Sequence, residues 1–177
     1  MKVGRKMILG VLKSLIIKIR NGKNIKMRIY KNISFLSEIK AKNAKIEIGR
    51  GLLLNRFASI GAINNGKILI GKNVSFNRNS ICASHKFISI GDNSSIGPNC
   101  CIYDHDHKFG KNGKESGFKT GDVIIEENVW IGAGCLILRG THIGKNSVIG
   151  AGCIVKGNIP PNSLVTQNRN LSIVELK

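Results

Sequence analysis

Residues 125–155 read IEENVW-IGAGCL-ILRGTH-IGKNSV-IGAGCI-V, in which an aliphatic residue opens each block of six. These aliphatic residues are Ile125, Ile131, Ile137, Ile143, Ile149 and Val155. Small side chains follow four positions later in most blocks, at Cys135, Thr141, Ser147 and Cys153. A period of six matches neither the turn of an α-helix nor a long alternating strand. It fits a short strand and a turn that repeat along a solenoid.

The same period is visible upstream, although it is interrupted there. It occurs at Ile90-Gly91, Ile96-Gly97 and Ile102, again at Ile70-Gly71 and Phe76, and faintly at Ile48-Gly49. Three such units would close a triangular coil, with aliphatic side chains stacked inside at the spacing of neighbouring strands, about 4.8 Å. Glycine suits the corners, where a left-handed backbone or a close approach is needed. The sequence therefore predicts an all-β protein, a parallel β-helix.

We divide the chain into three segments. Residues 46–166 carry the repeat and form the predicted β-helix domain, residues 1–45 lead into it, and residues 167–177 form a tail. Residues 108–122, KFGKNGKESGFKTGD, contain no aliphatic stacking residue. They are predicted to form a loop extruded from one coil, which a solenoid tolerates because the stack on either side stays intact.

The N-terminal segment is basic and amphipathic. Residues 1–28 contain nine basic and no acidic side chains, and Ile8, Leu12, Leu15 and Ile19 fall on one helical face. Two interpretations remain open: a helix at an anionic membrane surface, or a helix whose apolar stripe packs on the first coil and caps the solenoid. The longest apolar run is too short to span a bilayer, and no cleavage site follows it, so retained structure is expected and not a signal peptide.

The charge of the chain bears on its partners. The formal net charge is +18 at pH 7, and aromatic residues make up 5% of the chain. Such a charge suits nucleic acid or an anionic membrane. An AT-rich genome, which favours codons for Lys, Ile and Asn, accounts for much of the excess equally well. Aromatic stacking residues are scarce and no nucleic-acid-binding motif is present, so specific binding of nucleic acid is not expected.

The cysteines are interpreted as structural. Five are present, at positions 82, 100, 101, 135 and 153, without a CxxC pair. Their odd number and the lack of a secretory signal indicate reduced thiols in the cytoplasm, and neither a zinc ribbon nor a redox motif is expected. Cys135 and Cys153 lie eighteen positions apart, which predicts one corner of successive coils and a packing role.

The stretch most suited to chemistry is Ile102-Tyr103-Asp104-His105-Asp106-His107, just before the extruded loop. Histidine titrates near neutrality and can take a proton from a hydroxyl nucleophile. A neighbouring carboxylate can hold the other ring nitrogen protonated and so orient the base. The alternative is a polar turn at the end of a strand, where Asp is common for conformational reasons.

Several motifs resemble those of a known family. They are IGKNVSFNRN, IGDNSSIGPNC, DHDH, ENVWIGAGC, NSVIGAGCIV and IPPNS. Over residues 46–166 the chain resembles the hexapeptide-repeat acyltransferases. From Ile70 to His107 it is similar to the maltose and galactoside O-acetyltransferases and, more closely, to the WbbJ-type sugar acetyltransferases. The resemblance implies a left-handed β-helix, acetyl-CoA as co-substrate, no metal, and a homotrimer with active sites between subunits.

The resemblance also assigns roles at the acceptor side. The catalytic base of the family lies eleven positions after the aliphatic residue of the IGPN unit, which is His107 here, with the neighbouring His105 as second choice. Asn77 matches an asparagine that contacts the acceptor. His85 stands where the family often has an acidic acceptor contact, which puts the identity of the acceptor in doubt. Trp130 matches a tryptophan bordering the active site; a hydrophobic surface anchor is the alternative.

On the cofactor side, the resemblance implies that pantetheine runs along the backbone of Gly132, Ala133 and Gly134. Lys156 is displaced by one position from a lysine that meets a CoA phosphate, but its side chain is long and flexible. After the last coil, residues 167–171 (QNRNL) stand where the family usually has GNPAK. Arg169 in this stretch is expected to supply the positive charge of the missing lysine.

The implied function is acetyl-CoA-dependent O-acetylation of a sugar hydroxyl, on a surface polysaccharide or its precursor. The expected location is the cytoplasm, with peripheral contact at the inner face of the cytoplasmic membrane. Four alternatives stay open: N-acylation of an amino sugar, a non-catalytic module that binds anionic surfaces, a covalent route through Cys100 or Cys101, and a γ-type carbonic anhydrase. The last would use His105, His107 and His142 as zinc ligands, but these lack the spacing of that family.

Overall fold

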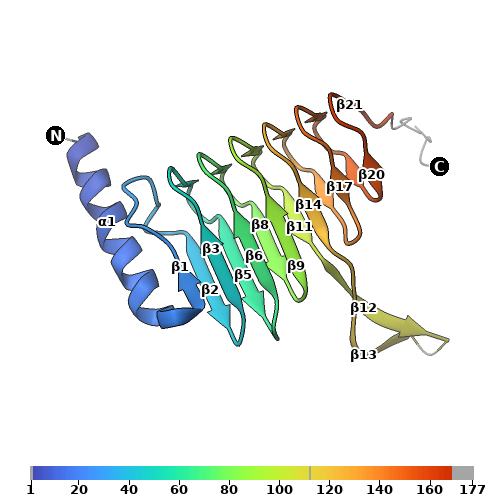
Figure 1. Cartoon of the computed structure of the whole chain (residues 1–177), viewed down its shortest axis with the longest axis horizontal. Helices are drawn as coiled ribbons and strands as arrows, with labels where there is room; N and C mark the ends of the chain where they lie inside the picture. Colours follow the sequence, from blue (N-terminus) through green and yellow to red (C-terminus); the bar gives the residue numbers. More distant parts are fainter. Residues whose placement is uncertain (1, 112, 169–177) are drawn as a thin grey trace, which may run out of the picture.

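The computed structural model describes residues 2–111 and 113–168. Helix α1 (Lys2–Asn21) is followed by a short 3₁₀ turn, η1 (Gly22–Asn24), and then by strands that wind into a stack of triangular coils. Figure 1 shows α1 across the N-terminal end of this stack and the last coils at the opposite end. The predicted parallel β-helix is thereby confirmed.

The strands form three parallel sheets, which we call faces A, B and C. Face A consists of β1 (Ile25–Lys26), β3 (Lys45–Ile48), β6 (Lys67–Ile70), β9 (Phe87–Ile90), β14 (Val123–Ile125), β17 (His142–Ile143) and β20 (Asn158–Ile159). Face B consists of β4 (Leu53–Leu54), β7 (Ser75–Phe76), β10 (Ser95–Ile96), β15 (Trp130–Ile131), β18 (Val148–Ile149) and β21 (Leu164–Val165). Face C consists of β2 (Glu38–Lys42), β5 (Ser59–Ile63), β8 (Ile81–Ser84), β11 (Cys101–Tyr103), β16 (Leu136–Ile137) and β19 (Ile154–Val155).

The register explains why the period is clear downstream and faint upstream. In the later coils Leu136 pairs with Ile154, eighteen positions on. In the earlier coils Ser75 pairs with Ser95, and Lys45 with Lys67, so those coils contain twenty and twenty-two residues. The extra residues lie in longer corners, and they break the six-residue period without changing the inward stacking.

The core is the column of aliphatic side chains that the period predicts. Ile131, Ile137, Ile143 and Ile149 are completely buried, and Val155 is 3% exposed. The small residues at the corners are buried as well, and Cys135 and Cys153 lie on successive coils as expected. The Ser147 hydroxyl donates to the Pro160 carbonyl oxygen of the next coil at 3.1 Å, so small polar residues also link the coils.

Asparagine, more than glycine, supplies the left-handed corner positions. Among the described residues, ten asparagines have positive φ: Asn43, Asn64, Asn65, Asn73, Asn79, Asn93, Asn99, Asn128, Asn146 and Asn162. The glycines of the Ile-Gly pairs instead allow close approach. A Cβ on Gly91 would lie 2.5 Å from the backbone of Glu126 and Glu127 in the next coil, closer than real Cβ contacts occur.

The segment predicted as an extruded loop is an ordered hairpin. Strands β12 (His105–Gly110) and β13 (Gly113–Thr120) pair in antiparallel fashion and project from the stack between β11 and β14 (Figure 1). The hairpin therefore includes His105 and His107, which precede the predicted loop of residues 108–122. The stacked strands resume at β14 on face A, as a tolerated insertion requires.

Helix α1 covers the first coil, but not with the predicted stripe. Its inner face contains Gly10, Ser14 and Ile17, all buried, and a Cβ on Gly10 would collide with the Lys31 carbonyl oxygen. The Ser14 hydroxyl donates to the Tyr30 carbonyl oxygen at 3.0 Å. The side chains of Ile8, Leu12, Leu15 and Ile19 are exposed on the outer face. Among the described residues, no helix is long and apolar enough to cross a membrane.

Candidate active site

Three histidines meet at the corner between faces C and A, where the hairpin leaves the stack. His85 follows β8, and its ring stacks on that of His105 with centroids 3.7 Å apart and planes 16° apart. Phe118 of β13 lies edge-on to His85 at 4.3 Å and tilted against His107 at 4.7 Å. The structure thus brings His85, His105 and His107 together around one phenylalanine.

The hairpin geometry decides which side chains face this cluster. Successive residues of a strand point to opposite sides, so His105 and His107 share one side of the ribbon. His107 is directly paired with Phe118 across the hairpin. Asp106 lies on the other side, where its Oδ2 accepts a hydrogen bond from the Arg139 Nε at 2.6 Å. Arg139 follows β16 on the next coil, so this bond ties the hairpin to the stack.

Asp104 anchors the cluster from inside the protein. Its carboxylate is completely buried. Oδ2 accepts hydrogen bonds from the Ser84 hydroxyl at 2.6 Å and the Lys86 N–H at 2.8 Å. Oδ1 accepts from the His85 N–H at 2.8 Å and lies 2.9 Å from the His105 Nδ1. A carboxylate on Nδ1 favours the tautomer whose other nitrogen, Nε2, is free to accept a proton.

The electrostatics of the cluster follow from this packing. Burial raises the pKa of Asp104, but the hydrogen bonds from His85, Ser84, His105 and Lys86 more than offset it, and the net pKa is lowered. The pKa of His85 is lowered by burial and then by the neighbouring His105. His85 is therefore neutral at neutral pH. His107 is exposed on the hairpin and accessible to a substrate hydroxyl.

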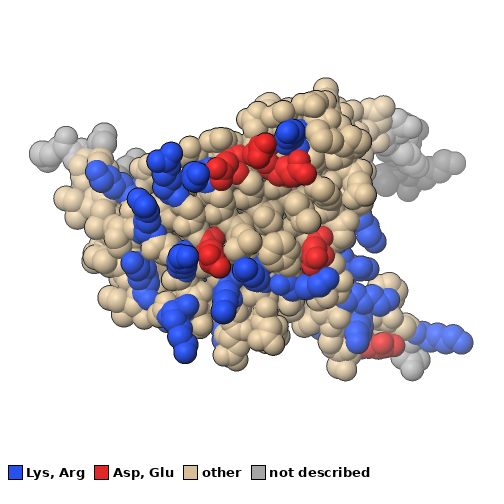
Figure 2. All heavy atoms as spheres, viewed as in Figure 1, with Lys and Arg blue, Asp and Glu red and all other residues tan. Residues whose placement is uncertain are grey.

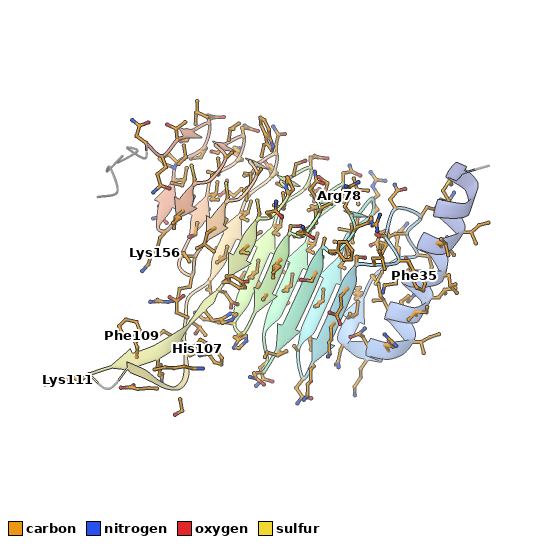
Figure 3. The ribbon with its side chains drawn as sticks, turned by 180° about the vertical axis from the view of Figure 1, so that it is seen from behind. Phe35, Arg78, His107, Phe109, Lys111 and Lys156 are labelled. Carbon is orange, nitrogen blue, oxygen red and sulfur yellow. The ribbon has the colours of Figure 1, made fainter. Side chains whose placement is uncertain are left out.

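Other expected site residues lie elsewhere on the coil. Asn77 and the Gly132–Gly134 stretch follow face-B strands, at the corner between faces B and C. Trp130 begins β15 at the corner between faces A and B, and 58% of it is exposed. Figure 3 shows Arg78, the neighbour of Asn77, at the opposite edge of the stack from His107 at the base of the hairpin. Within one chain, a whole face separates the Asn77 corner from the histidine cluster.

Lys156 follows β19 at the same corner as the histidine cluster, farther along the stack, and is exposed (Figure 3). The expected role of Arg169 falls outside the described residues.

A zinc site on His105, His107 and His142 and a covalent route through Cys100 receive no support from the described residues. His142 lies on face A, where its Nε2 is 2.9 Å from the Glu126 Oε1. Within residues 2–111 and 113–168, no group of three or more His, Cys, Asp or Glu side chains is arranged to hold a metal ion. Burial raises the pKa of the Cys100 thiol to about 11, so this thiol is not an activated nucleophile at neutral pH.

Sequence reasoning missed Phe118, Ser84 and Arg139. Phe118 lies thirteen positions from His105 and becomes its neighbour through the hairpin register. The hairpin of residues 105–120 has no buried face, so its strands show no alternation of apolar and polar residues. The sequence therefore contains no hydrophobic pattern that predicts it. Ser84 lies opposite Asp104 because their coils are stacked twenty residues apart.

Comparisons with known proteins agree with the observed fold. The family model for the bacterial transferase hexapeptide (six repeats) matches residues 122–157. A Saccharomyces cerevisiae protein whose name describes it as an acetyltransferase is 34% identical over 164 residues, covering 86% of this chain and 80% of the relative. The galactoside O-acetyltransferase of Escherichia coli is 35% identical over 133 residues, covering 67% of this chain and 64% of the relative.

A solved structure shows the same architecture over most of the chain. It is a galactoside acetyltransferase in complex with coenzyme A, which superposes with a TM-score of 0.56 at 25% identity. The match covers 92% of this chain and 76% of the other. The chain spans about half of the length of several other curated relatives that it matches.

Proposed function

The chain belongs to the hexapeptide-repeat acetyltransferase family, and on that premise we propose that it transfers an acetyl group from acetyl-CoA to a sugar hydroxyl. The observation that carries the proposal is the histidine cluster at the base of the hairpin. It presents the exposed imidazole of His107 against Phe118, beside a histidine held by a buried carboxylate.

In the proposed mechanism His107 is the general base. Its imidazole takes the proton of the sugar hydroxyl as the oxygen attacks the thioester carbonyl of acetyl-CoA. A backbone N–H stabilises the tetrahedral oxyanion. When the intermediate collapses, the C–S bond breaks, and the CoA sulfur takes the proton back from the imidazolium. The products are the acetyl ester and free CoA, and no acyl-enzyme forms.

The Asp104–His105 pair has a positioning role in this proposal. His105 is mostly buried, with 15% of its side chain exposed, and its ring stacks on His85 and lies edge-on to Phe118. Its contacts fix the start of β12, from which His107 extends two residues later. His105 stays the second choice for the base, because its Nδ1 already has the orienting carboxylate.

We further propose that the protein is a homotrimer with active sites between subunits. Asn77 and Gly132–Gly134 lie at one corner of the coil, and His107 and Lys156 lie at another. In this proposal one acceptor and one CoA molecule contact both sets because the two corners come from different copies. Cyclic closure of three copies would bring each such pair of corners together without leaving an open filament.

The proposed acceptor is a sugar of a surface polysaccharide or its precursor, and the reaction is placed in the cytoplasm. Two relatives are named for O-acetyl transfer to a galactoside. The five cysteines are free thiols, which fits a reducing compartment. Replacement of an acidic acceptor contact by the neutral His85 favours an acceptor without a cationic group at that position.

An acceptor panel tests the proposal directly. The full chain is incubated with acetyl-CoA and with sugars, their amino-sugar counterparts and lipid-linked oligosaccharides, and free CoA thiol is measured. Turnover with sugars and an ester product support O-acetylation. Turnover with amino sugars alone and an amide product would establish the N-acyl alternative. No release of CoA above the rate without acceptor, for any member of the panel, would contradict acetyl transfer.

A further inference from the structure

The outer face of α1 carries an apolar stripe that the fold does not use. Ile8 and Ile19 are 70% and 81% exposed, and Leu12 and Leu15 are each more than a third exposed. The capping of the solenoid is complete without them, because Gly10, Ser14 and Ile17 make the contacts with the first coil. Large apolar side chains gathered on one exposed face indicate an interaction surface.

The charges around the stripe define what it can contact. The first acidic residue of the chain is Glu38, and ten Lys and Arg residues precede it. Lys18 and Arg20 lie in the last turn of α1, and Lys13 lies on its flank, with its Nζ 5.4 Å from the Phe35 ring centroid. In Figure 2 the α1 end shows Lys and Arg side chains without Asp or Glu among them on the face in view.

We propose that α1 docks this protein on an anionic lipid surface, lying in the plane of the membrane with Ile8, Leu12, Leu15 and Ile19 inserted. An apolar face bordered by Lys and Arg is the pattern of helices that lie at the membrane interface. A second copy of the chain is a poorer occupant, since two such helix faces would bring their bordering Lys and Arg side chains together. Docking is independent of the proposed acetyl transfer and goes beyond it.

Vesicle binding by the full chain tests the proposal. The protein is sedimented with vesicles of neutral phosphatidylcholine, with or without anionic phosphatidylglycerol, at low and high ionic strength. Binding should require the anionic lipid and fall as salt is raised. The Ile8→Glu/Ile19→Glu double variant should lose roughly tenfold or more of the binding, since two inserted side chains become charged.

The matched control is Ile154→Glu/Leu164→Glu, at the other end of the stack. These residues are 51% and 71% exposed, and the control makes the same change in charge. It should bind vesicles nearly as the wild type does. Equal losses in both double variants, or binding that ignores lipid charge and salt, would overturn the proposal. So would a lipid-free self-association that the α1 variant alone abolishes, since the stripe would then hold a second copy.

Circular dichroism and acetyl transfer to a soluble acceptor accompany the binding assay. Both helix positions point away from the stack, so both measurements should match the wild type. A folded variant that binds no vesicles but keeps its turnover supports docking. An inactive wild-type protein that still binds vesicles would contradict the proposed function and leave docking supported.

Discussion

The imidazole rings of His85 and His105 lie face to face, 3.7 Å between centroids, although they come from successive coils. Two protonated rings at this distance would repel each other strongly in a partly buried site. The buried carboxylate of Asp104 holds both residues, through the backbone N–H of one and the ring Nδ1 of the other. The stack is therefore a protonation-sensitive element at the base of the hairpin.

The stability of the protein should fall as the pH drops through about 6.5. The pKa of His85 is lowered from its usual 6.5, by burial first and then by His105. Above that pH both folded and unfolded states carry a neutral His85, and the full stability is present. As the pH falls further, the unfolded state takes up the proton first, so the free energy of unfolding decreases until the lower folded pKa is passed.

The His85→Phe variant isolates this contribution, because phenylalanine keeps an aromatic ring in the stack and does not titrate. Urea unfolding of both proteins between neutral and mildly acidic pH should show a smaller loss of stability in the variant. Parallel pH profiles would mean that His85 does not contribute to the loss. His142→Phe, outside the cluster, serves as the control for removing a histidine.

Replacing Asp104 by Asn should destabilise the protein severely. The amide has nearly the same shape, but it loses the charge that accepts four hydrogen bonds and places a donor where an acceptor is needed. We expect a loss of about 3 kcal/mol in the free energy of unfolding, measured in denaturant. Asp106→Asn is the control. Its bond to Arg139 is partly exposed, and we expect about 1 kcal/mol or less.

The two Asp variants should also differ in acid. The pKa of Asp104 is lowered in the folded protein, so its contribution is present above the usual value of 3.8 and is lost as the pH falls through the folded value. Asp104→Asn should flatten the acid limb of the stability profile. An unchanged acid limb would show that other carboxylates dominate it.

His107→Ala should lower acetyl transfer by about a hundred- to ten-thousand-fold, the usual contribution of a general base. Because His107 is exposed on the hairpin, circular dichroism and thermal stability should stay close to the wild type. His142→Ala, a histidine on face A, should keep near-normal turnover. If His107→Ala remains active and a folded His105→Ala variant does not, the base is His105.

A shared active site predicts rescue between inactive subunits. Asn77→Ala and His107→Ala each remove one proposed component, from different corners of the coil. Subunits of the two variants, unfolded together and refolded in equal amounts, should regain about a quarter of wild-type activity, since one site in four receives both intact residues. Sedimentation should give the mass of a trimer. Mixtures that stay inactive, or an active monomer, would refute sharing between subunits.

The sequence predicted the repeated part of this fold well and the inserted part poorly, for a physical reason. An inward-facing aliphatic residue recurs every six positions from Ile125 to Val155, because every coil fills the same interior. The period is therefore visible in the sequence. The hairpin fills no interior, and its register is set by backbone pairing between residues such as His107 and Phe118. Residues 102–107 still indicate a candidate site, because their polar and titratable side chains are concentrated within six positions.

The sequence also marks the left-handed corners, but by asparagine and not by the glycines on which the prediction relied. Asparagine follows three positions after the aliphatic residue at Asn73, Asn93, Asn128, Asn146 and Asn162, and each has positive φ. Left-handed backbone is tolerated by Asn better than by other residues with a Cβ. The separation of the Asn77 corner from the histidine cluster could not be read from sequence, since it depends on which coil face lies between them.

The final prediction concerns the left-handed asparagines at the corner between faces A and B. Asn146 has φ of 59°, its side-chain amide donates to Asn162 Oδ1 at 3.0 Å, and its Oδ1 accepts from Asn128 at 3.0 Å. Replacement by Ala removes both bonds and leaves, at this left-handed position, a side chain that cannot form hydrogen bonds with the nearby backbone. Replacement by Gly removes the same bonds but suits that backbone.

Asn146→Ala should therefore be less stable than Asn146→Gly by about 1 kcal/mol, measured by chemical denaturation. Asn158→Ala, in β20 and outside the left-handed corners, controls for the loss of an asparagine side chain and should have a small effect. If the Ala variant is as stable as the Gly variant, the asparagines are retained for their hydrogen-bonded ladder and not for their backbone conformation.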